Sequence, residues 1–163
     1  MKIAVFTVSD RCYKNIKEDG TGPAIKNIIK KQGWKTEMYE IIPDEKNIIK
    51  QKLLSATKNN IDLVFTAGGT GPGKRDVTPE ATMEVIEKQI PGISEIMRIE
   101  SYKKTKFSVL SRGVCGILNN TLIINLPGSI KGAVENLEIL LPIIPHTIKV
   151  MNGSISDCTE DIK

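Results

Sequence analysis

The sequence predicts an α/β sandwich with a mostly parallel central sheet. Short, largely apolar runs at residues 3–8, 61–67 and 122–126 are typical of strands buried on both faces, and residues 34–42 have the pattern of another strand. Helical patterns lie between these runs, and each run is followed at once by Ser, Pro or Gly. Strands that alternate with helices indicate parallel pairing through right-handed crossovers.

The length of 163 residues predicts one domain, because two domains would each have a thin core. We place this domain at residues 1–151. Residues 152–163 are polar and lack periodicity, so we expect a flexible C-terminal tail. The content of 40% hydrophobic and 26% charged residues is typical of a soluble globular protein.

Composition argues against several classes of protein. The lysines are spread along the chain and aromatic residues make up only 4%, so a nucleic-acid-binding surface is not expected despite the net charge of +4. The apolar run at residues 3–8 is too short for a signal peptide or a membrane span, which leaves the cytoplasm as the expected location. Cys12, Cys115 and Cys158 are odd in number and far apart, and we expect three reduced, non-catalytic thiols.

Helix starts are marked by capping residues. Thr21 or Gly22 is expected to cap the first helix, Asp44 the second, and Thr78 the third, with Pro79 at its first helical position. Two further helical patterns follow, at residues 92–104 and 130–141.

Four polar loops are expected at one edge of the sheet. Ligands of open α/β sheets bind at the carboxyl ends of the strands. The loops that follow the four expected strands there are residues 9–11, 43–45, 68–78 and 127–129. They supply glycines, hydroxyls, cations and acids, which suit a phosphorylated ligand and a divalent metal.

The segment GGTGPG at residues 68–73 has four glycines, so its amides can turn toward a phosphate. The Thr70 hydroxyl, Lys74 and Arg75 can add contacts. The segment is not a P-loop, because Arg75 stands where Ser or Thr must bind magnesium, and its glycine spacing does not match the dinucleotide fingerprint. The alternative is a tight turn without a ligand.

Two acids and a serine are candidates beside this loop. Asp76 precedes a helix and is either a magnesium ligand or a complement to the helix dipole. Asp44 is equally compatible with a purely structural cap and with a functional role. Ser129 precedes the last long helix, where a cap and an anion pocket can coexist.

Six segments in order give the chain a specific resemblance. They are TVSDR (7–11), IPDE (42–45), TAGGTGP (66–72), RDVTPEAT (75–82), LSR (110–112) and NLPGS (125–129). With these segments the chain resembles the Mog/MoaB family, and specifically its molybdopterin adenylyltransferase branch, over roughly residues 1–150.

The resemblance implies a three-layer α/β/α fold of the Mog type, a homotrimer, and transfer of AMP from Mg-ATP to the phosphate of molybdopterin. It implies that Asp44 and Asp76 are catalytic and hold Mg²⁺. The expected substrate and nucleotide contacts are Ser9, Asp10, Gly68, Gly69, Thr70, Gly71, Arg75, Thr78, Ser111 and Ser129. Hand-over of the product to a molybdenum-insertion protein is a further expectation.

Two alternatives remain open. A MoaB-type pterin-binding carrier or scaffold would be catalytically inactive, and such relatives often replace the segment at residues 75–80, which is complete here. An unrelated nucleotide hydrolase could also use the glycine-rich loop. The chain departs from the family in the inserted Gly73-Lys74 and in its short C-terminus, and neither departure removes an expected site residue.

Overall fold

The computed structural model describes residues 1–153 and confirms a mixed, mostly parallel α/β sheet. In this part of the chain the strands lie in the order β2-β1-β3-β6-β5-β4. The first four of these are parallel neighbours, and β5 and β4 extend the sheet in antiparallel pairing. The strands are β1 (Lys2–Val8), β2 (Lys35–Ile42), β3 (Leu63–Ala67), β4 (Lys88–Gln89), β5 (Cys115–Leu118) and β6 (Thr121–Leu126).

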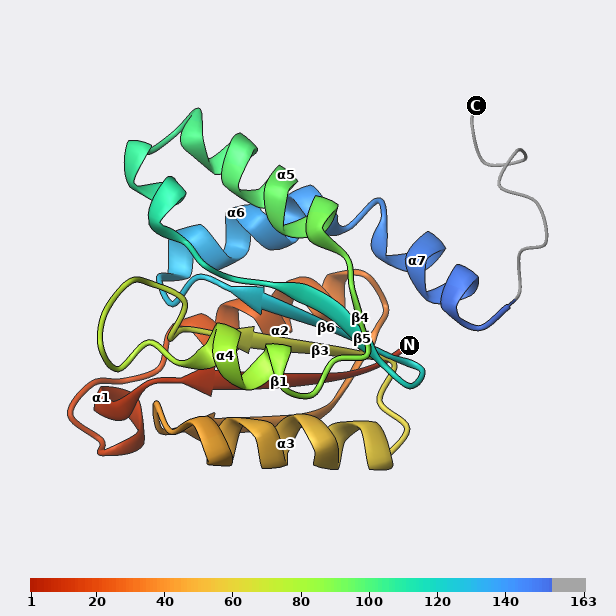
Figure 1. Cartoon of the computed structure of the whole chain (residues 1–163), viewed down its shortest axis with the longest axis horizontal. Coiled ribbons are helices and arrows are strands. Elements are labelled where there is room, and N and C mark those ends of the chain that lie inside the picture. Colours follow the sequence, from red (N-terminus) through yellow and green to blue (C-terminus); the bar gives the residue numbers. More distant parts are fainter. Residues whose placement is uncertain (154–163) are drawn as a thin grey trace.

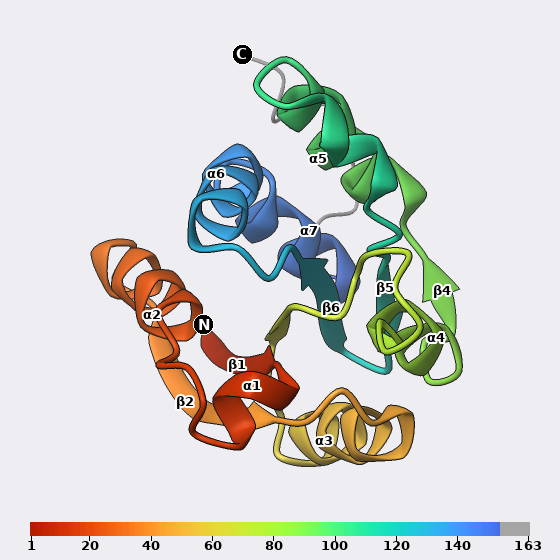
Figure 2. The same cartoon turned by 90° about the vertical axis from the view of Figure 1, so that its left-hand side faces the viewer.

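Helices cover both faces of this sheet, so the three expected layers are present (Figures 1 and 2). One face carries α2, α5, α6 and α7, and the other carries α3 and α4. The helices are α1 (Asp10–Tyr13), α2 (Thr21–Lys31), α3 (Lys46–Lys58), α4 (Thr78–Met83), α5 (Pro91–Tyr102), α6 (Ile130–Leu140) and α7 (Ile144–Met151), with a 3₁₀ helix η1 (Lys106–Leu110).

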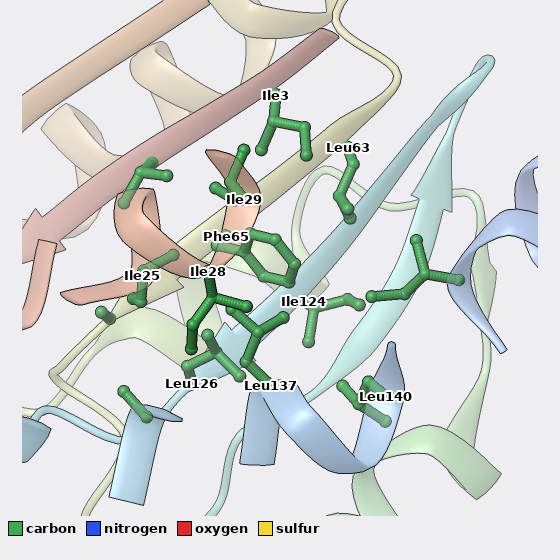
Figure 3. Packing of buried hydrophobic residues seen from close by; sticks show 14 of the residues in the cluster. Ile3, Ile25, Ile28, Ile29, Leu63, Phe65, Ile124, Leu126, Leu137 and Leu140 are labelled. Carbon is green, nitrogen blue, oxygen red and sulfur yellow. The ribbon is translucent and has the colours of Figure 1, made fainter. Parts of the chain in front are cut away.

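The alternation of side chains along the central strands builds two cores. In β1, Ile3 and Val5 point to the face covered by α2 and α6, whereas Ala4 and Phe6 point to the face covered by α3. Figure 3 shows the first core around Phe65. The strands β1, β3 and β6 are buried on both faces and are almost wholly apolar, which is why the sequence marks them so clearly. The outer strand β2 is only partly buried and carries several polar side chains.

The expected caps are wrong in detail for three helices. At α2 the cap position is Gly20, and the Asp19 carboxylate accepts hydrogen bonds from the amides of Thr21 and Gly22 at 2.8 and 3.1 Å. At α3 the cap position is Glu45, and at α4 it is Val77. The predicted caps Asp44 and Thr78 instead bind distant segments, so tertiary hydrogen bonds have replaced local ones.

The strands β4 and β5 were not predicted, because β4 has two residues and β5 gains its place only by pairing. A hairpin joins β5 to β6, and Asn119 adopts the left-handed conformation in it with φ of 52°. The last described helix ends at Met151, and nearly all of the expected tail, residues 154–163, lies outside the described residues.

Candidate functional site

The chain order reverses between β1 and β3. The chain passes from β1 to β2 on one side and then returns to place β3 on the other side of β1. All four parallel strands end at the same edge, where the loops at residues 9–11, 43–45, 68–78 and 127–129 follow them (Figure 1). Ligands of open α/β sheets bind at such a switch point, so the expected loops do lie where a site is expected.

The glycine-rich loop passes very close to its neighbours. Gly68 adopts φ of 115°, and a Cβ on it would collide with the carbonyl oxygen of Val8. Gly69 adopts φ of 61°, and a Cβ on it would lie 3.0 Å from Asp44 Oδ1. These two glycines therefore have packing reasons of their own. The Gly68 amide donates to the Leu126 carbonyl at 3.1 Å, so it is not available to a phosphate, contrary to the expectation that its amide faces the ligand.

Asp10 and Asp44 hold each other in place. The Asp10 amide donates to Asp44 Oδ2 at 2.7 Å, and the Asp44 amide donates to Asp10 Oδ1 at 3.1 Å. Arg75 then grips the Asp10 carboxylate through Nε at 3.0 Å and Nη2 at 3.1 Å, and also reaches Glu45 at 2.8 Å. Asp10 and Arg75 thus connect the loops at residues 9–11, 43–45 and 68–78. The side chains of both residues are occupied by these contacts and are not open to a ligand.

Asp44 and Asp76 line the same cavity. This cavity has a volume of about 660 Å³ and is called the larger cavity below, because a second one is smaller. Ser9, Gly68 and Gly69 also line it. The Gly73 amide donates to Asp76 Oδ2 at 2.8 Å, so the inserted glycine helps to hold this carboxylate. The two acids therefore converge from loops that are more than thirty positions apart in sequence.

The environment of Asp44 favours a cation. Burial, together with the negative charges of Asp10 and Asp76, raises the pKa of Asp44 above its usual value, although the Asp10 amide and Arg75 partly oppose the rise. Residues 1–153 contain no cluster of three or more His, Cys, Asp or Glu placed to hold a metal. Two carboxylates suit Mg²⁺ when phosphate oxygens and water complete its shell, so the donors fit that ion.

A second, smaller cavity borders the next part of the glycine-rich loop. Its volume is about 270 Å³, and Thr70, Gly71, Ser111 and Ser129 line it together with apolar side chains such as Met97. Ser129 caps α6 as predicted, since its Oγ accepts from the Gly132 amide at 3.2 Å. The structure thus divides most of the expected site residues between the two cavities, whereas Asp10 and Arg75 line neither.

Thr78 lines neither cavity. Its side chain is fully buried, and its hydroxyl donates to the Gly68 carbonyl at 2.9 Å. Its amide donates to the Gly69 carbonyl at 3.1 Å. Both bonds of Thr78 therefore fix the start of the glycine-rich loop. A direct contact of the Thr78 hydroxyl with a ligand would require its hydrogen bond to the Gly68 carbonyl to break.

Asp19 was not among the predicted site residues. Its carboxylate accepts from the Thr7 hydroxyl at 2.6 Å and the Tyr39 hydroxyl at 2.7 Å, besides the two amides of α2, and it lines the larger cavity. Burial raises its pKa, but these hydrogen bonds outweigh burial and leave the pKa below the usual value. An Asp two residues before Thr21 was the available signal for a cap.

Arg112, which the sequence presents only as part of the LSR segment, makes hydrogen bonds and an ion pair with the glycine-rich loop and α4. Its Nε donates to the Gly71 carbonyl at 2.8 Å, its Nη2 to the Asp76 carbonyl at 2.7 Å, and its Nη1 pairs with Glu80. Its own amide donates to the Thr70 carbonyl at 2.8 Å. No local pattern announces these contacts, because they join segments about 40 residues apart.

The two described cysteines form no disulfide, as expected of reduced thiols, and Cys12 lines the larger cavity. Cys12 and Cys115 are both reduced and buried, and burial raises the pKa of Cys115 to about 12, so it carries no thiolate near neutral pH. Cys158 lies outside the described residues. Among the helices of residues 1–153, none has both the length and the apolar character needed to cross a bilayer.

Comparisons with known proteins point to one family. Residues 4–146 match the family model described as probable molybdopterin binding domain. The chain is 41% identical to the molybdopterin adenylyltransferase of Helicobacter pylori (strain ATCC 700392 / 26695), over 97% of this chain and 92% of that protein. It is 40% identical to the molybdenum cofactor synthesis protein cinnamon of Drosophila melanogaster, over 93% of this chain but only 26% of that longer protein.

The fold has solved counterparts. The crystal structure of the molybdopterin biosynthesis enzyme MoaB of Thermus thermophilus superposes with a TM-score of 0.88 at 42% identity. The match covers 93% of this chain and 96% of that one.

Proposed function

The chain belongs to the family of the probable molybdopterin binding domain, and on this basis we propose that it is a molybdopterin adenylyltransferase. It transfers the adenylyl group of ATP to the phosphate of molybdopterin and releases pyrophosphate, as a step of molybdenum cofactor biosynthesis. The observation that carries the proposal is the convergence of Asp44, Asp76 and the glycine-rich loop on one cavity that adjoins a second.

The reaction joins two anions. An oxygen of the molybdopterin phosphate forms a bond to the α-phosphorus of ATP, while the bond from that phosphorus to the β-bridging oxygen breaks and its electron pair leaves with pyrophosphate. A phosphate monoester has a second pKa of about 6, so it is largely dianionic near neutral pH and needs little help from a base. Positioning and charge stabilisation by the protein therefore dominate catalysis.

The two cavities separate the two substrates. The larger cavity, with Asp44 and Asp76, is the place for the triphosphate, and the smaller, more apolar cavity is the place for the pterin. The glycine-rich loop borders both, and the amides of Gly69, Thr70 and Gly71 are the ones that we assign to phosphate oxygens. Ser129, at the N-terminus of α6, is assigned to the molybdopterin phosphate.

Asp44 and Asp76 would hold the magnesium ion. When bound, Mg²⁺ neutralises charge on the triphosphate and on the departing pyrophosphate. Asp44 is held by the Asp10 amide and Asp76 by the Gly73 amide, so each carboxylate is fixed in orientation and keeps acceptor capacity for a cation. Asp10 and Arg75 act behind Asp44 by fixing its loop.

The test follows pyrophosphate release by the purified protein with molybdopterin, ATP and Mg²⁺. We expect release only when all three are present. Asp76→Asn and Asp44→Asn should each lower kcat/KM about a hundredfold or more, because a lost metal ligand removes several kcal/mol of transition-state stabilisation. Asp62→Asn, at the opposite edge of the sheet, is the matched control and should keep full activity.

The alternative is a pterin-binding carrier without catalysis. It predicts molybdopterin binding with no pyrophosphate release under any condition. Release of phosphate or pyrophosphate from ATP without molybdopterin would instead indicate a nucleotide hydrolase. Either result would overturn the proposed activity.

Three further attributes belong to the proposal. We propose a homotrimer, supported by a group of exposed apolar side chains on α5 and η1 that a partner subunit could cover. We propose a cytoplasmic location, where ATP is available. The adenylylated product would pass to a molybdenum-insertion protein, since an activated phosphate anhydride is of use only to an enzyme that consumes it.

A further inference from the structure

The smaller cavity contains one carboxylate. Its lining is mostly apolar or neutral, and its charged members are Arg98 and Glu135. Arg98 reaches the Gly113 carbonyl through Nη1 at 3.3 Å, whereas Asp44 and Asp76 belong to the larger cavity. Glu135 is therefore the acid that a ligand in the smaller cavity would meet.

The contacts of Glu135 fix its carboxylate and leave acceptor positions open for a ligand. Its side chain is 21% exposed, and its Oε1 pairs at 3.2 Å with Nζ of Lys104, which lies in the turn after α5. A carboxylate has two oxygens and about four acceptor positions, so this ion pair leaves room for further donors. The neighbouring Asn136 already has one partner at each polar atom of its side chain, since its Nδ2 donates to the Gly132 carbonyl and its Oδ1 accepts from Ser101.

The spacing along α6 suits an elongated ligand. Ser129 caps the helix at the end assigned to the molybdopterin phosphate, and Glu135 lies in the second turn on the side of the cavity. The stretch between them rises about 9 Å along the helix axis. This separation is on the scale of a fused ring system that carries its phosphate at one end and its pyrimidine ring at the other.

The pyrimidine ring of a pterin has a characteristic edge. Its N3–H and its 2-amino group are adjacent donors that point the same way, and a carboxylate can accept from both at once. This pairing has the fork geometry of an Arg–carboxylate pair and is charge-assisted. Serine, threonine and asparagine, which make up the other polar lining, carry donors as well as acceptors and match this edge less well.

We propose that Glu135 is a specificity-determining residue that accepts from the N3–H and 2-amino groups of the pterin. The inference rests on the proposed function, because that function places a pterin in the smaller cavity. Lys104 then orients the carboxylate from the side.

The test compares Glu135→Gln with two controls. Glutamine keeps the size but sets an amide donor against a donor of the ligand, so KM for molybdopterin should rise about tenfold or more. Because the contact lies far from the reacting phosphates, kcat and KM for ATP should change by less than about twofold. Glu138→Gln, exposed on the same helix, should behave as wild type, and Lys104→Met should have a smaller effect than Glu135→Gln.

A binding measurement separates this inference from the proposed activity. Titration of the protein with molybdopterin in the absence of ATP, followed by pterin fluorescence, gives a Kd that needs no turnover. A Kd that rises about tenfold in Glu135→Gln supports the inference even if no pyrophosphate is ever released. An unchanged Kd in a variant that melts like wild type, or an equal rise of Kd in Lys104→Met, would overturn it.

Discussion

Asp44 combines a structural cost with a proposed role. Its carboxylate is partly buried beside the charges of Asp10 and Asp76, and its pKa is raised. A raised folded-state pKa means that the folded protein binds the proton more tightly than the unfolded chain does. The ionised carboxylate at neutral pH is therefore a destabilising feature, as is common for groups that await a cation.

The Asp44→Asn variant should accordingly be at least as stable as wild type above the raised pKa. Asparagine removes the charge but keeps an acceptor for the Asp10 amide. The advantage should shrink as pH falls through that pKa toward the ordinary range of aspartate, because wild type then becomes neutral there too. Urea unfolding of both proteins across pH measures the difference.

Asp19→Asn is the control of opposite sign. The lowered pKa of Asp19 gives stability that is present above the unfolded-state pKa and is lost as pH falls through the folded-state pKa. Asp19→Asn should therefore be less stable than wild type at neutral pH, with a difference that fades in acid. If both variants shift stability in the same direction, our account of the charges around the larger cavity is wrong.

At the scale of elements, the loop between β3 and α4 is held by a residue from another segment of the chain. Arg112, just after η1, donates to the carbonyls of Gly71 and Asp76 and pairs with Glu80. The same contact to Arg112 lowers the pKa of Glu80. A guanidinium can span these acceptors because its donors form a rigid, planar fork. Arg112 thus positions the loop that carries Asp76.

Arg112→Lys should loosen this loop. Lysine has a compact ammonium that cannot reach the same set of acceptors, so we expect kcat/KM to fall about tenfold and the Mg²⁺ concentration for half-maximal rate to rise. The measurement is the Mg²⁺ dependence of pyrophosphate release.

Glu80→Gln isolates the ion pair. Because this pair is exposed, its loss should cost little while the bonds to the two carbonyls remain. A normal Mg²⁺ dependence in Arg112→Lys would mean that the contacts of Arg112 do not position Asp76.

At the scale of the whole molecule, five exposed apolar side chains lie on two neighbouring elements, α5 and η1. Ile99 and Tyr102 of α5 and Phe107, Val109 and Leu110 of η1 are between 42% and 79% exposed. Ile99, Tyr102 and Val109 line one shallow depression, so they form a continuous surface. An apolar group of this kind is typical of a surface that another subunit covers.

Charge on this surface should dissociate the proposed trimer. Ile99→Glu and Val109→Glu would bury a carboxylate against an apolar partner, and we expect monomers in light scattering after size exclusion. Leu54→Glu, on α3 at the opposite face, should leave the assembly intact. A wild-type protein that is monomeric at micromolar concentration would contradict the trimer.

The fold was largely predictable because its signals are local. The apolar runs of β1, β3 and β6 and the stripes of α2 and α6 are set by burial on a regular period, which a sequence displays directly. The short strands β4 and β5 are missed because pairing, of β5 with β6 and of β4 with β5, makes them strands, and composition does not. The caps at Asp44 and Thr78 were misplaced for a related reason, since distant partners outcompeted local ones.

The sequence by itself determined the four parallel strands, the main helices between them, the loops at the carboxyl edge and the family. Only the tertiary structure decided that Asp10 and Asp44, 34 residues apart, hold each other, and that Arg75 binds Asp10 from 65 residues away. It also decided that most of the expected site residues border two cavities. Periodicity and capping act within a few residues, whereas these contacts exist only after packing brings strand ends together. The roles of Asp19, Arg112 and Glu135 likewise depend on contacts that form only after packing.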